Sequence, residues 1–197
     1  MRKICLFLFI CWCPSLFPST SSAKSGIEGV YVHGAGWPEV IVYSDYFCGG
    51  CYDIEPAMED VLTDLSQLGA KIVFVDYPSG LSEAVFSKYF LYSANADGRL
   101  DEMLRTRRIL FELAQGGTIK SERQLIEELR QKEVKLEPMK VNPILRQWND
   151  LIQQHEIMKT PASMVSWPPR ADQVHVGVNE AIQGLMELLE ELEGSRE

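Results

Sequence analysis

Cysteine, histidine and positive charge are all scarce in this chain of 197 residues. It contains five cysteines and three histidines, and its 28 acidic side chains outnumber the 19 lysines and arginines, which gives a formal net charge of −9. Such an acidic chain lacks the basic surface that binds nucleic acid, so no nucleic-acid partner is expected. A zinc site needs about four Cys or His ligands, and His33, His155 and His175 are scattered along the chain. The sequence therefore predicts no metal site.

Long apolar runs are also missing. The longest one, Ile4 to Cys13, is well short of the ~20 residues that a membrane-spanning helix needs. It follows two basic residues and precedes a polar stretch that closes on small residues at Ser21 and Ala23. This pattern is typical of a secretory signal peptide, so residues 1–23 are predicted to be cleaved off and the remainder exported and soluble. A leader retained as a membrane anchor is the alternative.

Cleavage of the leader would leave only Cys48 and Cys51, in the segment SDYFCGGCYDIEP. A single local pair does not make a disulfide-rich scaffold. It is also a weak structural staple, because closing so short a loop restricts the unfolded chain little. Two cysteines at this spacing suit thiol–disulfide exchange, or the binding of a soft metal ion. Of these two interpretations, we favour thiol–disulfide exchange.

The hydrophobic pattern predicts one α/β domain over residues 24–197, with a long helical segment in its middle. Expected strands are residues 29–33, 40–43, 71–77, 162–166 and 174–178. Expected helices run from Cys51 to Leu68, then start near Ser82, Leu100, Ser121 and Asn142, with a last helix capped by Asn179. The strand–helix–strand unit around the cysteines implies two parallel strands with a right-handed crossover.

Cys48 follows a predicted strand and opens a predicted helix. The free backbone N–H groups and the dipole at a helix start favour a thiolate, which is the reactive form in disulfide exchange. Cys51 is expected on the same helical face, turned inward, where it can resolve a mixed disulfide formed at Cys48. Gly49 and Gly50 are expected to let the backbone of a bound partner approach. Cys48 and Cys51 are thus the predicted catalytic residues.

Two segments resemble the thioredoxin fold, VIVYSDYFCGGCYDIEP at residues 40–56 and KTPASMVS at residues 159–166. With the intervening helices and the predicted export, they are similar to the DsbA-like disulfide oxidoreductases of the bacterial cell envelope. The resemblance covers most of Pro38 to Leu192. It implies a thioredoxin-like α/β fold with a helical insertion at about residues 82–154.

The resemblance also implies a function. It points to a periplasmic thiol–disulfide oxidoreductase without an organic cofactor, which acts on exported proteins with cysteines and is reset by a membrane redox partner. Pro161 is expected to be cis, to stand against the cysteine pair and to keep metal off the sulfurs. With Thr160 it would present backbone groups to a bound peptide, so Thr160, Pro161, Gly49 and Gly50 are the expected substrate-binding residues. The alternative is that Thr160 and Pro161 merely start an edge strand.

Three departures from the family pattern leave the direction of exchange open. The strongest oxidants carry Pro-His between the cysteines, where this chain has Gly49 and Gly50, and this points to a weaker oxidant. The buried acid that the family often has six residues before the first cysteine is replaced by Val42. Thr160 resembles the residue found in isomerases and reductases. A thiol-based metal chaperone, or a peptide-binding module with an incidental cysteine pair, is the alternative from a different class.

Four aromatic residues flank the cysteine pair, at Tyr43, Tyr46, Phe47 and Tyr52. Most of them are expected in the core or at its rim. One or two are expected to form an apolar platform for unfolded clients, and the sequence does not say which.

Overall fold

The computed structural model describes residues 32–34, 36–78 and 80–195. The predicted signal peptide, residues 1–23, lies outside this part of the chain, as does most of the predicted strand at residues 29–33. Cleavage after Ala23 and the domain boundary that follows from it therefore stay predictions. Within the described ranges, no helix combines the length and the apolar character needed to cross a bilayer.

One mixed sheet runs through the molecule, in the strand order β1-β3-β2-β4-β5. The strands are β1 (Val32–His33), β2 (Glu39–Ser44), β3 (Lys71–Asp76), β4 (Ala162–Ser166) and β5 (Gln173–Val176). β2 and β3 pair in parallel, with Ser44 opposite Asp76, as the strand–helix–strand pattern predicted. The remaining neighbours pair antiparallel. The apolar runs of β2 and β3 are buried, because helices cover both faces of the sheet.

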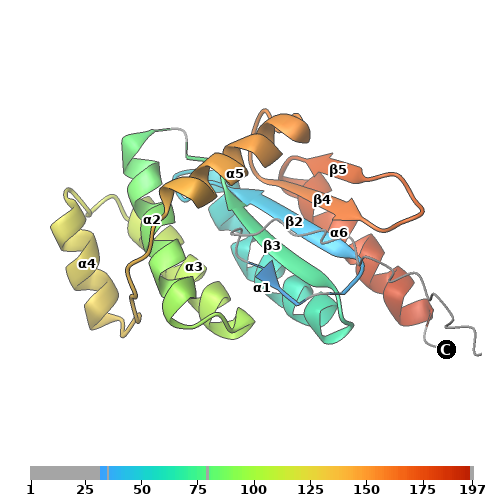
Figure 1. The fold of residues 1–197 in the computed structure, drawn as a ribbon, viewed down its shortest axis with the longest axis horizontal. Helices are drawn as coiled ribbons and strands as arrows, with labels where there is room; N and C mark the ends of the chain where they lie inside the picture. The colour runs from blue at the N-terminus through green and yellow to red at the C-terminus, as the bar shows by residue number, and fades with distance from the viewer. Residues whose placement is uncertain (1–31, 35, 79, 196–197) are drawn as a thin grey trace, which may run out of the picture.

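The helices of the described residues are α1 (Gly49–Gln67), α2 (Leu81–Ala96), α3 (Leu100–Gln115), α4 (Glu122–Gln131), α5 (Asn142–Gln154) and α6 (Val178–Gly194). α1 and α6 pack against each other on one face of the sheet, and α5 crosses the opposite face (Figure 1). α2, α3 and α4 gather at one end of the sheet (Figure 1). The chain between β3 and β4 is therefore helical, as the predicted insertion requires.

Two predicted boundaries near the C-terminus are wrong. β5 ends at Val176 rather than at Val178, and the N-cap of α6 is Gly177 rather than Asn179. Gly177 has a φ of 129°, which residues with a side chain rarely adopt. Its carbonyl accepts a hydrogen bond of 3.0 Å from the backbone N–H of Ala181. This glycine therefore ends the strand and starts the helix earlier than the sequence pattern suggested.

The helix that was predicted to start near Asn142, with this residue as its cap, has its N-cap one residue earlier. Asn142 lies inside the helix and Val141 is the N-cap, with no side-chain hydrogen bond. Pro143 falls in the first turn, where its missing N–H costs nothing. The proline therefore sets the start of this helix without help from a capping side chain.

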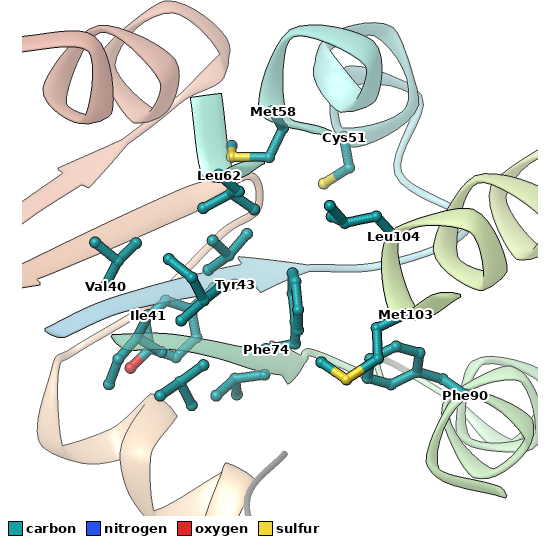
Figure 2. Close-up of a cluster of buried hydrophobic side chains, with 14 of the residues drawn as sticks. Val40, Ile41, Tyr43, Cys51, Met58, Leu62, Phe74, Phe90, Met103 and Leu104 are labelled. Atoms are coloured by element: carbon teal, nitrogen blue, oxygen red, sulfur yellow. The ribbon is translucent and has the colours of Figure 1, made fainter. Parts of the chain in front are cut away.

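The hydrophobic core joins the sheet to α1 and α3. Figure 2 shows Cys51, Met58 and Leu62 pointing from α1 toward the sheet, with Leu104 approaching from α3. All four side chains are buried, and so is Phe74 of β3. Cys51 is thus a core residue as well as half of the cysteine pair.

A buried arginine connects α3 to the segments that flank the cysteine pair. Arg107 is fully buried and donates hydrogen bonds of 2.9 Å to each carboxylate oxygen of Glu55 on α1. It donates a third bond, of 3.1 Å, to Ser44 Oγ at the end of β2. The rings of Phe74 and Phe111 lie 4.7 and 5.5 Å from its guanidinium carbon. Removing one partner of a buried ion pair lowers the stability of the folded state by about 3–5 kcal/mol. The contact between Arg107 and Glu55 therefore fixes α3 against α1 and β2.

A second buried acid lies beside the same arginine. Asp76 is 1% exposed, and its Oδ1 is 3.9 Å from Arg107 Nη1. Burial raises the pKa of Asp76 to about 7, although the positive charge of Arg107 opposes the rise. Burial also raises the pKa of Glu55, again against Arg107. One cation therefore faces two carboxyl groups, and burial favours the protonated form of both.

We expect this arrangement to make the folded state less stable as the pH rises from about 4 to about 7. The pKa of Asp76 is higher in the folded state than its ordinary value of 3.8, so the folded protein binds more protons than the unfolded chain across this window. Between pH 5 and pH 7 the wild type should lose about 1–3 kcal/mol of unfolding free energy relative to Asp76→Asn. Urea unfolding of both proteins at each pH measures the difference. Parallel pH profiles for the two proteins would contradict the assignment.

Candidate active site

Cys48 stands at the junction between β2 and α1. The turn before it is fixed by two hydrogen bonds to Asp45, from the backbone N–H of Phe47 to Oδ1 at 2.8 Å and from that of Cys48 to the carbonyl at 3.0 Å. Cys48 is the N-cap of α1, and its sulfur accepts a hydrogen bond of 3.3 Å from the backbone N–H of Cys51. The prediction that Cys48 opens the helix is confirmed. The side chain of a half-buried cysteine thus faces the free N–H groups of a helix start.

Cys51 lies one turn into the helix and is only 2% exposed. Both cysteines are free thiols in this structure. Burial raises the pKa of Cys51 to about 12, and a hydrogen bond with Cys48 adds to the rise. The inward orientation predicted for Cys51 is confirmed, and Cys48 is the more accessible sulfur of the pair.

The loop before β4 lies against the sulfur of Cys48. The carbonyl of Thr160 lies 3.4 Å from Cys48 Sγ, and the Thr160–Pro161 peptide bond is cis. The carbonyl of Pro161 accepts a hydrogen bond of 2.9 Å from the backbone N–H of Gly177. β4 pairs with β2 on one side and with β5 on the other, so it is not an edge strand. The structure thus brings Cys48, Cys51, Thr160 and Pro161 together.

The two glycines between the cysteines have different surroundings. A Cβ at Gly50 would lie 2.8 Å from Val178 Cγ2 and 3.6 Å from Pro161 Cδ. A Cβ at Gly49 would meet nothing within 4 Å. A side chain at position 50 would therefore force Val178 to shift, a packing constraint that the sequence did not reveal. Gly49 faces open space.

Four exposed apolar side chains come from segments that belong to the site or adjoin it in sequence or packing. Tyr43 and Tyr46 are buried, whereas Phe47 and Tyr52 are each 40% exposed. Sequence reasoning missed two more residues, Val178, which contacts Gly50, and Met158, which is 84% exposed two residues before Thr160. Met158 precedes the Thr-Pro pair in the sequence and could have been found there. Val178 could not, because its position depends on the packing of α6 against α1.

No group of three or more potential metal ligands lies together in the described part of the chain. The ring of His155 instead contacts the hydroxyl of Tyr43, and the ring of His175 lies over Gly184, where a Cβ would come within 2.5 Å of it. Both histidines therefore have surroundings that are explained by packing.

The difference between the cysteines predicts selective alkylation. At pH 8, iodoacetamide should modify Cys48 in the reduced native protein and leave Cys51 unmodified, because Cys51 is buried and its pKa is about 12. Mass spectrometry of tryptic peptides locates the label. In protein that lacks residues 1–23, and with them Cys5, Cys11 and Cys13, a Cys48→Ala control should take up one label in urea and none when folded. Equal labelling of the two native cysteines would contradict this geometry.

The glycines predict a contrast in stability. Gly50→Ala should lower the free energy of unfolding by about 1–3 kcal/mol, because the new methyl group overlaps Val178. Gly49→Ala is the matched control and should be neutral or slightly stabilising, because it fills open space on the same helix. The double variant Gly50→Ala/Val178→Ala should recover part of the loss. Urea unfolding measures all three, and equal stability of the two single variants would show that the overlap is relieved without cost.

The structure of the chain is similar to several solved structures. Proteus mirabilis ScsC in a transitional conformation matches with a TM-score of 0.63 and 16% identity, over 83% of this chain and 72% of that chain. A periplasmic thioredoxin-like protein from Salmonella enterica serovar Typhimurium matches with a TM-score of 0.63 and 14% identity, over 83% of this chain and 90% of that chain. The thiol-disulfide exchange protein α-DsbA2 of Wolbachia pipientis matches with a TM-score of 0.57 and 16% identity, over 83% of this chain and 87% of that chain.

No protein-family model matches the chain, and no curated protein matches it significantly by sequence. The resemblance to known proteins is therefore one of fold. It confirms the predicted thioredoxin-like α/β fold.

Proposed function

We propose that the protein is a periplasmic thiol–disulfide oxidoreductase that exchanges disulfides with exported client proteins. The observation that carries the proposal is the position of Cys48 Sγ, 3.3 Å from the backbone nitrogen of Cys51 and 3.4 Å from the carbonyl of Thr160. An accessible sulfur, a buried partner in reach and a peptide-like loop beside both are the parts that disulfide exchange needs.

In the oxidising direction, the reaction starts from a disulfide between Cys48 and Cys51. A client thiolate attacks Cys48 Sγ, the bond between the two cysteines breaks, and Cys51 leaves as a thiolate. Burial raises the pKa of Cys51 to about 12, so this thiolate takes up a proton at neutral pH. A second client thiolate then attacks the client sulfur of the mixed disulfide and releases Cys48. The client loses two electrons to the cysteine pair.

The same residues support the reverse reaction. The Cys48 thiolate attacks a client disulfide, and Cys51 loses its proton and attacks Cys48 to release the reduced client. Neither Gly49 nor Gly50 adds a charged group beside the sulfur, and Thr160 is the residue type of reductases and isomerases. In either direction a membrane redox partner would reset the pair.

The exposed apolar side chains near Cys48 suit an unfolded client. Phe47, Tyr52, Met158 and Val178 offer apolar contacts that a chain with exposed core residues can use. The loop at Thr160 and Pro161 lies beside the sulfur, where the backbone of a bound peptide would pass. These contacts support a polypeptide client, which carries a free cysteine in the oxidising direction and a disulfide in the reverse one.

Replacement of each cysteine separates the proposed roles. Cys48→Ala should abolish insulin reduction and the oxidative refolding of a reduced client, because the attacking sulfur is gone. Cys51→Ala should trap clients as mixed disulfides, because nothing resolves the bond at Cys48. Non-reducing electrophoresis and mass spectrometry detect the adducts, with the double variant as the control. Inactive wild-type protein that binds copper or zinc tightly and stoichiometrically would instead favour a metal chaperone.

The reduction potential decides the direction of exchange. A shift of about 30 mV changes the equilibrium tenfold, so equilibration of the cysteine pair with glutathione buffers distinguishes the candidates. We expect a value less oxidising than about −120 mV, because no group between the cysteines stabilises a thiolate further. A potential near about −270 mV would reject the oxidase, and one near about −120 mV would reject the reductase and isomerase.

A further inference from the structure

One tyrosine of β2 contacts both ends of the loop before β4, and the proposed exchange gives that contact no role. The loop spans residues 155–161, between α5 and β4. Directly after the loop, Ala162 pairs with Tyr43 in the register of β4 and β2. At the start of the loop, Nδ1 of His155 contacts the hydroxyl of Tyr43, and the two rings meet edge to face with centroids 6.0 Å apart. Tyr43 thus joins the two ends of the loop to the same strand.

The ionisation of the two side chains defines which of them donates the hydrogen bond. Burial raises the pKa of Tyr43, and the negative charge of Glu39 adds to the rise, so the hydroxyl keeps its proton. Burial lowers the pKa of His155, although the charges of Asp172 and Glu39 oppose this, so the ring is mostly neutral at pH 7. Tyr43 therefore donates to Nδ1, and the proton of the ring is on Nε2. Because Tyr43 is fully buried and a buried hydroxyl needs a partner, the contact favours one position of His155.

The same tyrosine relates the loop to the attacking sulfur. Tyr43 lies five residues before Cys48, on the strand that leads to it. The loop in turn places the carbonyl of Thr160 3.4 Å from Cys48 Sγ. The sulfur and the loop that lies against it are therefore positioned from one strand, and the contact with His155 is part of this arrangement.

Other contacts also hold the loop, so the hydroxyl of Tyr43 is one support among several. The carbonyl of Pro161 accepts a hydrogen bond of 2.9 Å from the backbone N–H of Gly177. Ile157 is 2% exposed, whereas Met158 beside it is 84% exposed. Loss of the hydroxyl would therefore loosen the first half of the loop and leave its last residue in place. The expected effect is a decrease in the time that the loop spends in its observed position, with the fold retained.

We propose that Tyr43 and His155 are positioning residues, which hold the loop before β4 where the backbone of Thr160 binds the backbone of a client. The inference rests on the proposed function, and it separates clients from small disulfides. A client has a peptide backbone and would bind less tightly in proportion to the time that the loop spends elsewhere. A small disulfide without a backbone needs only the sulfur of Cys48, so its reaction would not change.

The test compares two activated disulfides on the Cys51→Ala protein that lacks residues 1–23, in which Cys48 is the only thiol. One is a peptide of Gly, Ser and Ala whose single cysteine carries a 2-thiopyridyl group, and the other is 2-hydroxyethyl 2-pyridyl disulfide. In both, the Cys48 thiolate bonds to the sulfur of the cysteine or of the hydroxyethyl group, and pyridine-2-thione leaves with the electron pair of the broken S–S bond. Its absorbance gives both second-order rate constants. Tyr43→Phe, which removes only the hydroxyl, should lower the rate constant of the peptide about three- to tenfold and leave that of the small disulfide unchanged.

Variants of the partner test whether the contact itself is responsible. His155→Phe keeps a ring but removes Nδ1, so it should reproduce the loss, and adding Tyr43→Phe to it should lower the rate constant no further. His155→Asn, whose side-chain oxygen takes the place of Nδ1 as acceptor, should retain most of the rate. Tyr89→Phe is the matched control, because the hydroxyl of this buried tyrosine donates to Glu122 in the inserted helices. It should change neither rate constant.

The outcomes separate this inference from the proposed function. If the wild type catalyses neither insulin reduction nor oxidative refolding, the proposed function fails and the inference falls with it. If the wild type is active and Tyr43→Phe leaves the rate constant of the peptide unchanged, only the inference is overturned. Equal slowing of both disulfides also overturns it, because the hydroxyl would then act on the sulfur rather than on the loop, and so does an additive loss in the double variant. If Tyr43→Phe fails to fold by circular dichroism, His155→Phe and His155→Asn carry the comparison.

Discussion

The buried pair of Arg107 and Glu55 joins the two parts of this molecule at the base of the redox helix. Arg107 comes from α3 in the inserted segment, and Glu55 lies one turn after Cys51 on α1. A third bond, to Ser44, holds the end of the strand that leads to Cys48. Both flanks of the cysteine pair are thus tied to one side chain of the insertion. Because a buried charge needs its partner, the insertion cannot shift without disturbing the site.

That connection makes the inserted helices part of the support of the site. The sheet, α1 and the loop before β4 place Cys48, Cys51 and Pro161 together. The insertion packs against the turn that leads to Cys48, where the rings of Phe47 and Phe86 lie 5.1 Å apart. The position of Cys48 therefore depends on contacts from both parts of the chain.

The interior acids of this chain come from other positions than the family pattern suggests. The residue six positions before Cys48 is Val42, which is buried and apolar. Glu55 and Asp76 instead bring carboxyl groups into the interior, from α1 and from the strand next to β2. Nothing in the sequence around Glu55 and Asp76 shows how their carboxyl groups are accommodated there. Only their approach to Arg107, 52 positions from Glu55 in the chain, explains how they can be there.

The sequence by itself was enough to predict most of the elements and to single out the cysteine pair. Local patterns suffice for these, because a β-branched run predicts the strand before Cys48, and the period of apolar residues predicts the helix after it. The CxxC spacing then places one sulfur at the helix start and the other inward, as the structure confirms. The thioredoxin-like fold followed from the same segment together with the Thr160–Pro161 pair.

Contacts between distant segments were decided only by the tertiary structure. The overlap that a side chain at position 50 would make is with Val178, 128 residues away in sequence. The start of α6 depended on the backbone conformation of Gly177, which composition does not reveal. Periodicity reports which face of an element is buried, but not which side chain from another element lies against it.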